Sequence, residues 1–114
     1  MIESGDTMAK YQTQLNTNFN QLLSKIEQGI VNGSISASLE ERSDFYKEEY
    51  RCSVRVFERY SYTGGNRVSL TVTLFGKDGD ISLSAITSGG SQGIFLKLNT
   101  FGEDAFLEKL IELL

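Results

Sequence analysis

Apolar and polar residues alternate along most of the chain, and this two-residue period predicts a protein built mainly of β-strands. The alternation begins at residues 8–15 and is clearest at 68–75 and 80–87, where one set of positions is entirely apolar. These apolar positions are Val68, Leu70, Val72, Leu74, Ile81, Leu83 and Ala85. A four-residue loop at 76–79 would pair the two sets directly, and a slip by one residue would destroy that match.

Two other segments repeat their apolar residues every three or four positions, which is typical of amphipathic helices. The first helix is predicted at about 18–31, with Asn18 as its N-cap. The second is predicted at 103–113, after a similar capping residue at Thr100. Each helix has one apolar stripe, and both stripes need a partner layer to bury them.

The glycine-rich stretch "SAITSGGSQG" at 84–93 has the composition of a phosphate-binding loop. Such a loop leads into the N-terminus of a helix, whereas this stretch leads into the alternating segment "IFLKL" at 94–98. A two-residue turn at Gly89-Gly90 would set the apolar residues of the two flanking segments opposite each other. We therefore predict a hairpin turn here and no nucleotide site.

Together these elements predict a two-layer α+β domain, in which five or six antiparallel strands form a meander and two helices cover one face. A further strand is expected at 35–39, whereas the charged, aperiodic residues 40–49 are expected to form a loop. The domain is expected to span 8–114. The segment at 1–7 is short, acidic and polar, and we expect it to be a disordered leader or a remnant of cloning.

The composition narrows the chemistry. The 114 residues include no histidine and one cysteine, so the usual general base and most metal ligands are missing. We expect no catalytic residue, no cofactor and no metal. The net charge of −4 argues against nucleic acid as a partner, and no apolar stretch is long enough to span a membrane. A lone cysteine without a secretion signal favours the cytoplasm.

Two segments, "VFERYSYTGGNRVSLTVTLFG" and "LSAITSGGSQGIFLKLNTFGEDAFL", resemble a small family of bacterial proteins with no assigned activity, found mostly in Gram-positive species. The resemblance runs from about residue 8 to residue 114. It implies an α+β fold and a cytoplasmic setting, and it transfers no catalytic residue to this chain. The order of elements is also similar to the TATA-binding-protein-like and helix-grip folds, which is a likeness of fold and not of function.

The candidate binding face is the side of the predicted sheet opposite the apolar one. Four of the five arginines lie within residues 51–67, where the net charge is +3 against −7 for the rest of the chain. The residues expected on this partner- or ligand-binding face are Arg51, Arg55, Arg59, Arg67, Thr71, Thr73 and Phe75. The alternative is an ordinary solvated sheet face, on which arginines only increase solubility.

A weaker candidate is Glu58. If a loop at 64–66 sets Tyr60 opposite Leu70, Glu58 falls on the apolar side of its strand, beside Tyr60 and Tyr62. Burial there would raise its pKa and suit it to acid–base chemistry, whereas a β-bulge near Phe57 would turn it outward. Cys52 alternates with Val54 and Val56, so it is expected to be a small buried apolar residue. It is not expected to be a nucleophile, because the chain has no histidine to activate it.

Three functions follow from these features. The first is a non-enzymatic module that binds a partner protein or a small ligand. The second is a homo-oligomer, such as a homodimer, that associates through the hydroxyl-rich face or a strand edge. In one form of it, the arginine-bearing face meets an acidic segment, such as residues 40–49 of a second copy. The third is an enzyme that uses Glu58 and the nearby tyrosines.

Overall fold

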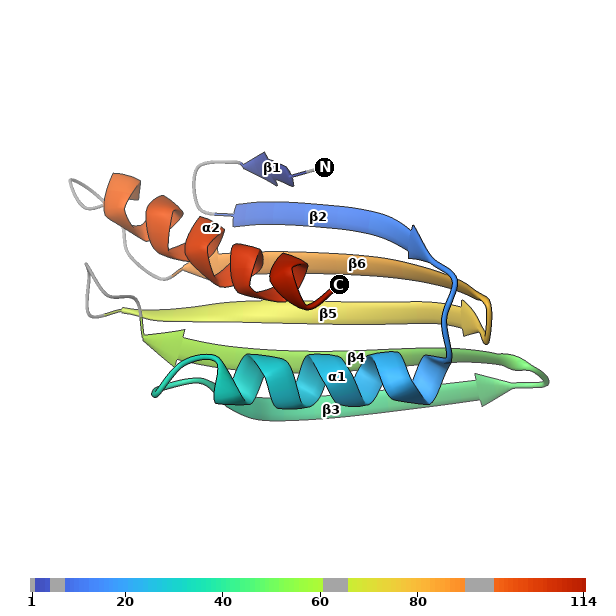
Figure 1. The fold of residues 1–114 in the computed structure, drawn as a ribbon. Helices are drawn as coiled ribbons and strands as arrows, with labels where there is room; N and C mark the ends of the chain where they lie inside the picture. The colour runs from blue at the N-terminus through green and yellow to red at the C-terminus, as the bar shows by residue number, and fades with distance from the viewer. Residues whose placement is uncertain (1, 5–7, 61–65, 90–95) are drawn as a thin grey trace.

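The computed structural model describes residues 2–4, 8–60, 66–89 and 96–114 of the chain. Its strands are β1 (Ile2–Ser4), β2 (Met8–Leu15), β3 (Ser38–Lys47), β4 (Tyr50–Tyr60), β5 (Arg67–Lys77) and β6 (Asp80–Gly89). Its helices are α1 (Phe19–Asn32) and α2 (Leu96–Leu113). The strands form one antiparallel sheet in the order β1-β2-β6-β5-β4-β3, and both helices lie on the same face (Figure 1). The predicted two-layer α+β fold is confirmed.

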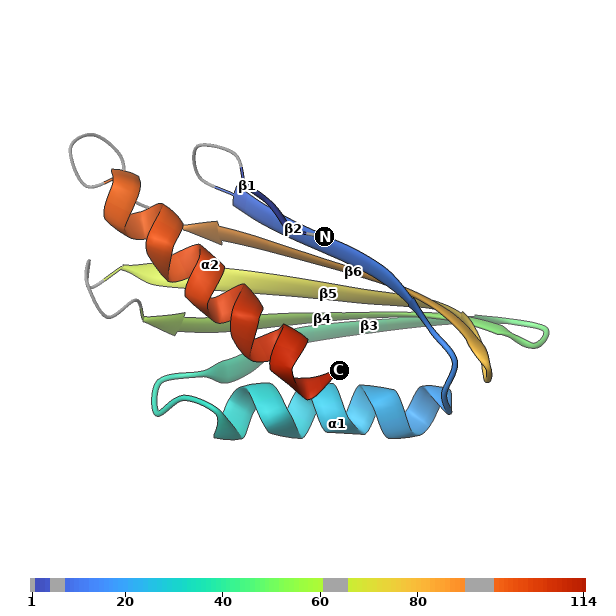
Figure 2. The same ribbon diagram turned by 45° about the horizontal axis from the view of Figure 1, so that its top comes forward.

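The helices divide the covered face between them. Figure 2 shows α1 running along the β3–β4 side of the sheet while α2 crosses β5 and β6 at an angle. The apolar stripe of α1 and the last turns of α2 bury the inward side chains of the sheet. The largest fully buried side chains are Phe57, Phe106, Ile26, Ile30, Leu70, Leu74, Ile81, Leu83, Leu107, Leu110 and Val68. The strand predicted at 8–15 and the helix predicted at 18–31 are both confirmed.

The C-terminal helix is longer than predicted. It begins at Leu96 and not near Glu103, so the alternating segment read as a strand at 94–98 already enters α2. A short apolar run fits a strand and a buried helix equally well, which explains the error. The turn predicted at Gly89-Gly90 falls partly on residues 90–95, which lie outside the described residues; Gly89 itself ends β6 opposite Val68.

The charged segment read as a loop at 40–49 is largely strand β3. This strand lies at the edge of the sheet, and most of its residues are exposed on both faces, so it needs no apolar period. The strand predicted at 35–39 is wrong except for its last two residues, and Ile35 is fully exposed in a turn. A register shift between Leu39 and Glu41 marks a bulge in the edge strand.

The β5–β6 hairpin has a tighter turn than predicted. Lys77 pairs with Asp80, which leaves only Asp78 and Gly79 in the turn. Leu74 therefore pairs with Leu83 and not with Ile81. The register differs from the predicted one by two residues, and because side chains alternate with period two, the inward apolar face is unchanged.

This turn also fixes the start of α1. The Phe19 backbone N–H donates to Asp78 Oδ1 at 2.8 Å, and the Gln21 N–H donates to Asn18 Oδ1 at 2.9 Å. The N-cap predicted at Asn18 is therefore present, and the carboxylate of Asp78, in the β5–β6 turn, supports the same end of the helix. Asp78 satisfies a second N–H group at the positive end of the helix.

Candidate functional site

The arginines of β4 lie on the helix-covered face of the sheet. Arg55 and Arg59 are only 4% and 3% exposed, and Arg51 is half-buried on the same face. Val54 and Val56 point to the opposite face, where they are half-buried. The prediction that Arg51, Arg55 and Arg59 form an exposed partner-binding face is therefore wrong. The physical reason is that α1 and β3 supply polar partners that allow the cations to be buried.

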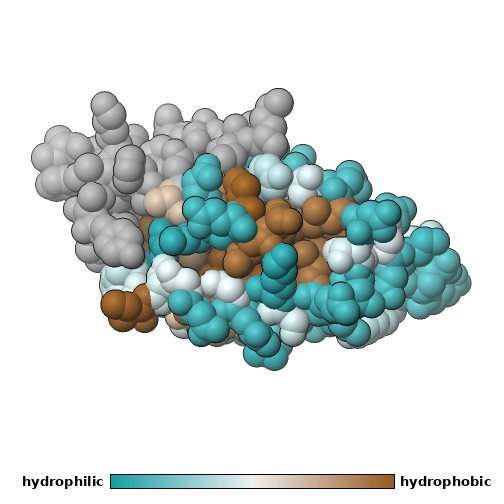
Figure 3. Space-filling view, in the orientation of Figure 1, coloured by the Kyte–Doolittle hydropathy of each residue, from teal (hydrophilic) through white to brown (hydrophobic). Residues whose placement is uncertain are grey.

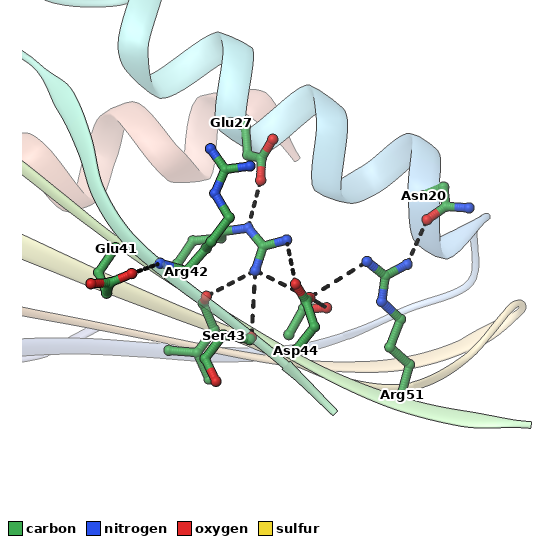
Figure 4. A network of polar contacts seen from close by, with 10 residues as sticks. Asn20, Glu27, Glu41, Arg42, Ser43, Asp44 and Arg51 are labelled. Carbon is green, nitrogen blue, oxygen red and sulfur yellow. Dashed lines mark hydrogen bonds and ion pairs between the residues drawn. The ribbon is translucent and has the colours of Figure 1, made fainter. Parts of the chain in front are cut away.

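Arg55 is the centre of a polar network between the two layers. Figure 4 shows its partners Glu27 on α1 and Asp44 on β3. Its Nε donates to Glu27 Oε2 on α1 at 2.5 Å. Its two terminal nitrogens reach Asp44 on β3, at 3.1 Å to Oδ1 and 3.2 Å to Oδ2. Nη1 also donates to the Val54 carbonyl at 2.9 Å. Arg55 thus joins α1, β3 and β4, and groups of the protein itself accept its hydrogen bonds.

Asp44 is held as a carboxylate by this network. Burial raises the pKa of Asp44, but the hydrogen bonds from Ser53 and Arg55, and the charges of Arg55 and Arg51, outweigh it and keep the pKa below its usual value. Ser53 Oγ donates to Asp44 Oδ1 at 2.5 Å. Burial likewise lowers the pKa of Arg55, and its bonds to Glu27 and Asp44 more than offset that effect and raise it.

Arg51 is held between aromatic rings near the start of α1. Its guanidinium carbon lies 4.8 Å from the centre of the Phe19 ring and 5.0 Å from that of Tyr46. Its Nη1 donates to Asn20 Oδ1 at 2.5 Å, and its Nη2 lies 3.5 Å from Asp44. Stacking on two rings and pairing with a carboxylate make this arginine a structural contact.

Arg59 ends the same row, and its Nη1 donates to Ser34 Oγ at 2.7 Å while its guanidinium covers the Phe106 ring at 4.5 Å. The partners of the three arginines on or just beyond α1 are Asn20, Glu27 and Ser34. These partners are seven residues apart and the arginines are four apart. Seven helical residues rise about 10.5 Å and four strand residues about 13 Å, so the two series stay roughly in step.

The face without helices, which we call the open face, is the candidate interaction surface. Phe45 and Phe75 are 67% and 54% exposed there, and Ile86 is 36% exposed. Thr71 and Thr73 are half-buried on this face, as predicted for two of the binding-face residues. The open face combines hydroxyl groups with exposed aromatic and aliphatic side chains.

Neighbouring residues on the open face form rows across five strands, from β3 to β2. The Phe75 row is Phe45, Cys52, Phe75, Ser82 and Gln14. The Thr73 row is Ser43, Val54, Thr73, Ser84 and Gln12. The Thr71 row is Glu41, Val56, Thr71, Ile86 and Lys10. The first two rows contain no charged residue, and the third has opposite charges at its two ends.

Cys52 lies in the Phe75 row. Its side chain is half-buried and it forms no disulfide. The prediction of a residue on the buried, apolar side of β4 is wrong, because the whole strand faces the other way. The thiol sits between Phe45 and Phe75, its direct neighbours on the adjacent strands.

Glu58 also lies on the open face and not on the apolar side. Arg67 Nε donates to Glu58 Oε1 at 2.6 Å, and Arg67 Nη2 forms an ion pair with the same carboxylate. The β4–β5 register runs without interruption here, so the orientation of the whole strand, and not a bulge near Phe57, turns Glu58 outward. Tyr60 pairs with Arg67, whose guanidinium lies 5.4 Å from its ring centre. Tyr62 lies outside the described residues.

Two hollows lie elsewhere on the surface. The larger, of about 410 Å³, is at the end of the sheet near the start of α1. The residues that define it are Phe19, Tyr46, Tyr50, Arg51, Lys77 and Asp78, together with Glu48 and Glu49. The other, of about 300 Å³, is bordered by Leu15, Leu22, Lys25, Leu113 and Leu114. Figure 3 shows apolar surface at the centre of the helix-covered face, surrounded by polar side chains.

The described residues contain neither a metal-binding cluster nor a helix that could span a membrane. Among 2–4, 8–60, 66–89 and 96–114, no cluster of three or more histidine, cysteine or acidic side chains has the geometry to hold a metal ion. Within the same ranges, neither helix is long and apolar enough to cross a membrane.

Residues 8–114 match the model of a protein family described as "Family of unknown function (DUF6054)". The chain belongs to this family. The match begins at the first residue of β2 and includes the whole of α2, so the DUF6054 region contains both helices and every strand except β1. No curated protein matches the chain. Membership of the DUF6054 family therefore assigns a relationship and no activity.

Sequence reasoning missed Glu27 and Asp44, the two acids that bury Arg55. The sequence did contain a signal for this network. Polar residues recur every seven positions, at Asn20, Glu27 and Ser34, and arginines recur every four positions within residues 51–59. Phe45 was considered as a partner contact, but on a loop at 40–49, and its place on an edge strand was not predicted. An aromatic residue between charged neighbours is compatible with an exposed edge strand.

Proposed function

We propose that this chain is a non-enzymatic module that binds another protein through the open face of its sheet. The observation that carries this proposal is the exposure of Phe45, Phe75 and Ile86 on a face that neither described helix covers. Exposed apolar side chains that gather on one face, as Phe45 and Phe75 do on either side of Cys52, are typical of an interaction site. Thr71 and Thr73 add hydroxyl groups that can form hydrogen bonds with a partner.

The extent of this face, which spans five strands, favours a protein over a small molecule as the partner. Small ligands need concave sites that bury most of their surface. The hollow that the described residues form on the open face has a volume of about 230 Å³ and lies between Gln12, Thr73, Phe75 and Ser84. A broad surface with scattered apolar contacts fits the centre and rim of a protein interface.

A small ligand is the second candidate, and the hollow of about 410 Å³ at the end of the sheet supports it. The rings of Tyr46 and Tyr50 line it beside Arg51 and Lys77, and charges of both signs surround it. This chemistry suits a planar or zwitterionic molecule. The enzyme alternative has less support, because the Glu58 carboxylate is already paired with Arg67.

Affinity capture with matched variants tests the main proposal. Thr73→Glu places a charge at the centre of the open face, and Phe75→Ser removes an exposed ring. Ser24→Glu, at an exposed position on α1, is the control. A partner captured by the wild type and by Ser24→Glu, lost with both open-face variants, and protecting β4–β6 from hydrogen exchange would support the proposal. Equal capture by all four proteins would contradict it.

The setting we propose is the bacterial cytoplasm. The single cysteine among 114 residues supports it, because structural disulfides are rare in reducing compartments. The element order strand, helix, four strands, helix after β1 also supports a relationship to TATA-binding-protein-like folds, as a proposal based on order alone.

A further inference from the structure

We propose that the protein bound by the open face is a second copy of the same chain, related by a two-fold axis that runs along β5. This inference rests on the proposed function, because it names the occupant of the same surface. Two such sheets would pack face to face and form a four-layer dimer with the helices outside.

The strand order is compatible with this two-fold symmetry. Leaving aside the short β1, the order is β2-β6-β5-β4-β3, so β5 is the middle strand. A two-fold axis along β5 lays β4 of one copy over β6 of the other, and β3 over β2. Each row of the open face therefore meets the same row of the second copy in reverse order.

The Thr71 row is complementary to itself in this arrangement. Glu41 at its β3 end meets Lys10 of the second copy at the β2 end, and the symmetry repeats the contact. Val56 meets Ile86 of the second copy, also twice, and Thr71 meets its own equivalent on the axis. One row thus supplies two ion pairs at the rim and two apolar contacts inside them.

The other two rows add no conflict. In the Phe75 row, Phe75 meets its own equivalent and Cys52 meets Ser82 of the second copy. In the Thr73 row, Val54 meets Ser84 of the second copy. No like charges are brought together in these three rows. Aligned sheets cross at about 30°, so the row ends shift by a few ångströms, which long lysine and glutamate side chains can span.

The other face-to-face symmetry fits less well. An axis across the strands through the Thr73 row would lay the Thr71 row on the Phe75 row of the second copy. Glu41 would then meet Phe45, and Lys10 would meet Gln14. Glu41 would be desolvated against the Phe45 ring instead of facing a cation of the second copy, which is costly. The charge pattern therefore favours the axis along β5.

The open face also has sufficient area. Five strands about 4.8 Å apart and about 30 Å long give a footprint of about 700 Å² on each copy. A standard protein interface buries about 800 Å² on each partner. We therefore expect a dimer that dissociates in the micromolar range or below, since interfaces of this size vary widely in affinity.

Sedimentation velocity from about 1 µM upward tests the inference directly. We expect the wild type to shift from monomer to dimer with concentration, and Thr73→Glu and Phe75→Ser to remain monomeric. Glu41→Lys and Lys10→Glu should each weaken the dimer at least about fivefold, because each replaces two ion pairs with two like-charge contacts. The double variant Glu41→Lys/Lys10→Glu should restore it. Lys25→Glu, on the exposed side of α1, is the matched charge control.

Cys52 provides a second readout that needs no substitution. It is the only cysteine in the chain, and dimer formation would cover it with Ser82 of the second copy. Its rate of alkylation should therefore fall as protein concentration rises, in parallel with the dimer fraction. Failure of the double variant to restore association, in a wild type that does dimerise, would overturn the axis along β5.

The failures of the two proposals are distinguishable. A wild type that stays monomeric at every concentration, with Cys52 equally reactive throughout, would overturn self-association. The proposed function would still stand if a different captured protein were lost with Thr73→Glu. A dimer unaffected by Thr73→Glu, together with capture unaffected by it, would overturn both.

Discussion

The Glu27 carboxylate on α1 lies 2.5 Å from Nε of Arg55 on β4, and this contact joins the helix layer to the sheet. Asp44 on β3 approaches the same guanidinium from the other side. An arginine cannot lose its proton in a protein, so a buried guanidinium depends on both acids. The acids are less dependent on the arginine, because about a quarter of each side chain is exposed to solvent.

This asymmetry predicts the order of two substitutions. Asp44→Ala should lower the free energy of unfolding by about 3 kcal/mol, because it leaves Arg55 buried with one countercharge. Arg55→Met should cost only about 1–2 kcal/mol, because the remaining carboxylates can reach water. Urea unfolding measures both, and Lys47→Met, an exposed position on the other face of β3, is the control, with an expected change below about 0.5 kcal/mol. The reverse order would contradict this account of the network.

The same network predicts a loss of stability in acid. The pKa of Asp44 is held below its usual value in the folded protein, so its stabilising effect is complete above the unfolded value of about 3.9. It is lost as the pH falls through the folded value. The difference in free energy of unfolding between wild type and Asp44→Asn should therefore be constant from about pH 7 to pH 5 and shrink below about pH 4.

A non-titrating substitution serves as the control for that experiment. Leu83→Ala removes a side chain that is buried on the inward face of β6, and it should cost about 2–5 kcal/mol. Its cost does not depend on the proton of Asp44. If the Asp44→Asn difference stayed constant down to pH 3, the depressed pKa of Asp44 would be refuted.

The β3–β4 turn predicts a stabilising substitution. Glu48 has φ 57, in the left-handed region that costs a residue with a Cβ about 1 kcal/mol or more. Glu48→Gly should relieve this strain and raise the midpoint of thermal unfolding, with a gain of about 0.5–1 kcal/mol. Glu49→Gly is the matched control, because Glu49 does not have positive φ, and it should lower stability by a similar amount.

Two glycines near the β5–β6 turn should respond differently to the same change. Gly76 has φ 139, and a Cβ there would lie 2.1 Å from the Asp80 carbonyl oxygen. Gly79 has φ 84, but the nearest atom to its added Cβ would be Asn16 Oδ1 at 3.5 Å. Gly76→Ala should cost about 3 kcal/mol or more, and Gly79→Ala about 1 kcal/mol. Equal costs in chemical denaturation would show that the clash at Gly76 is relaxed by movement of the turn.

The sequence predicted the orientation of β5 and β6 correctly because only one of their two faces is apolar. The positions of Val72 and Leu83 could not be moved to the other side without exposing the core. Their exact pairing could not be obtained in the same way. A shift by two residues keeps every inward pair apolar, so the pattern cannot tell a two-residue turn from a four-residue loop.

The orientation of β4 failed for a physical reason. Its outward set contains Val54 and Val56, whereas its inward set contains Arg55 and Arg59, so hydrophobicity alone chooses the wrong face. The inward choice is favourable only because partners on other elements neutralise the cations. Such partners become visible only when the helix and the strand are placed side by side. Phe57, within the arginine set, was the one apolar indication.

The pairing of β2 with β6 has a consequence for how the chain is made. The Thr87 hydroxyl donates to the Ala9 carbonyl across 78 positions of sequence, while the β3–β6 meander is built from neighbours along the chain. Local hairpins close quickly, whereas distant strands must wait for the loop between them to close. During synthesis β2 therefore emerges with only the three-residue β1 beside it, and its other edge stays unpaired until almost the whole chain has left the ribosome. Over that interval the edge of β2 that β6 will occupy is open to other chains.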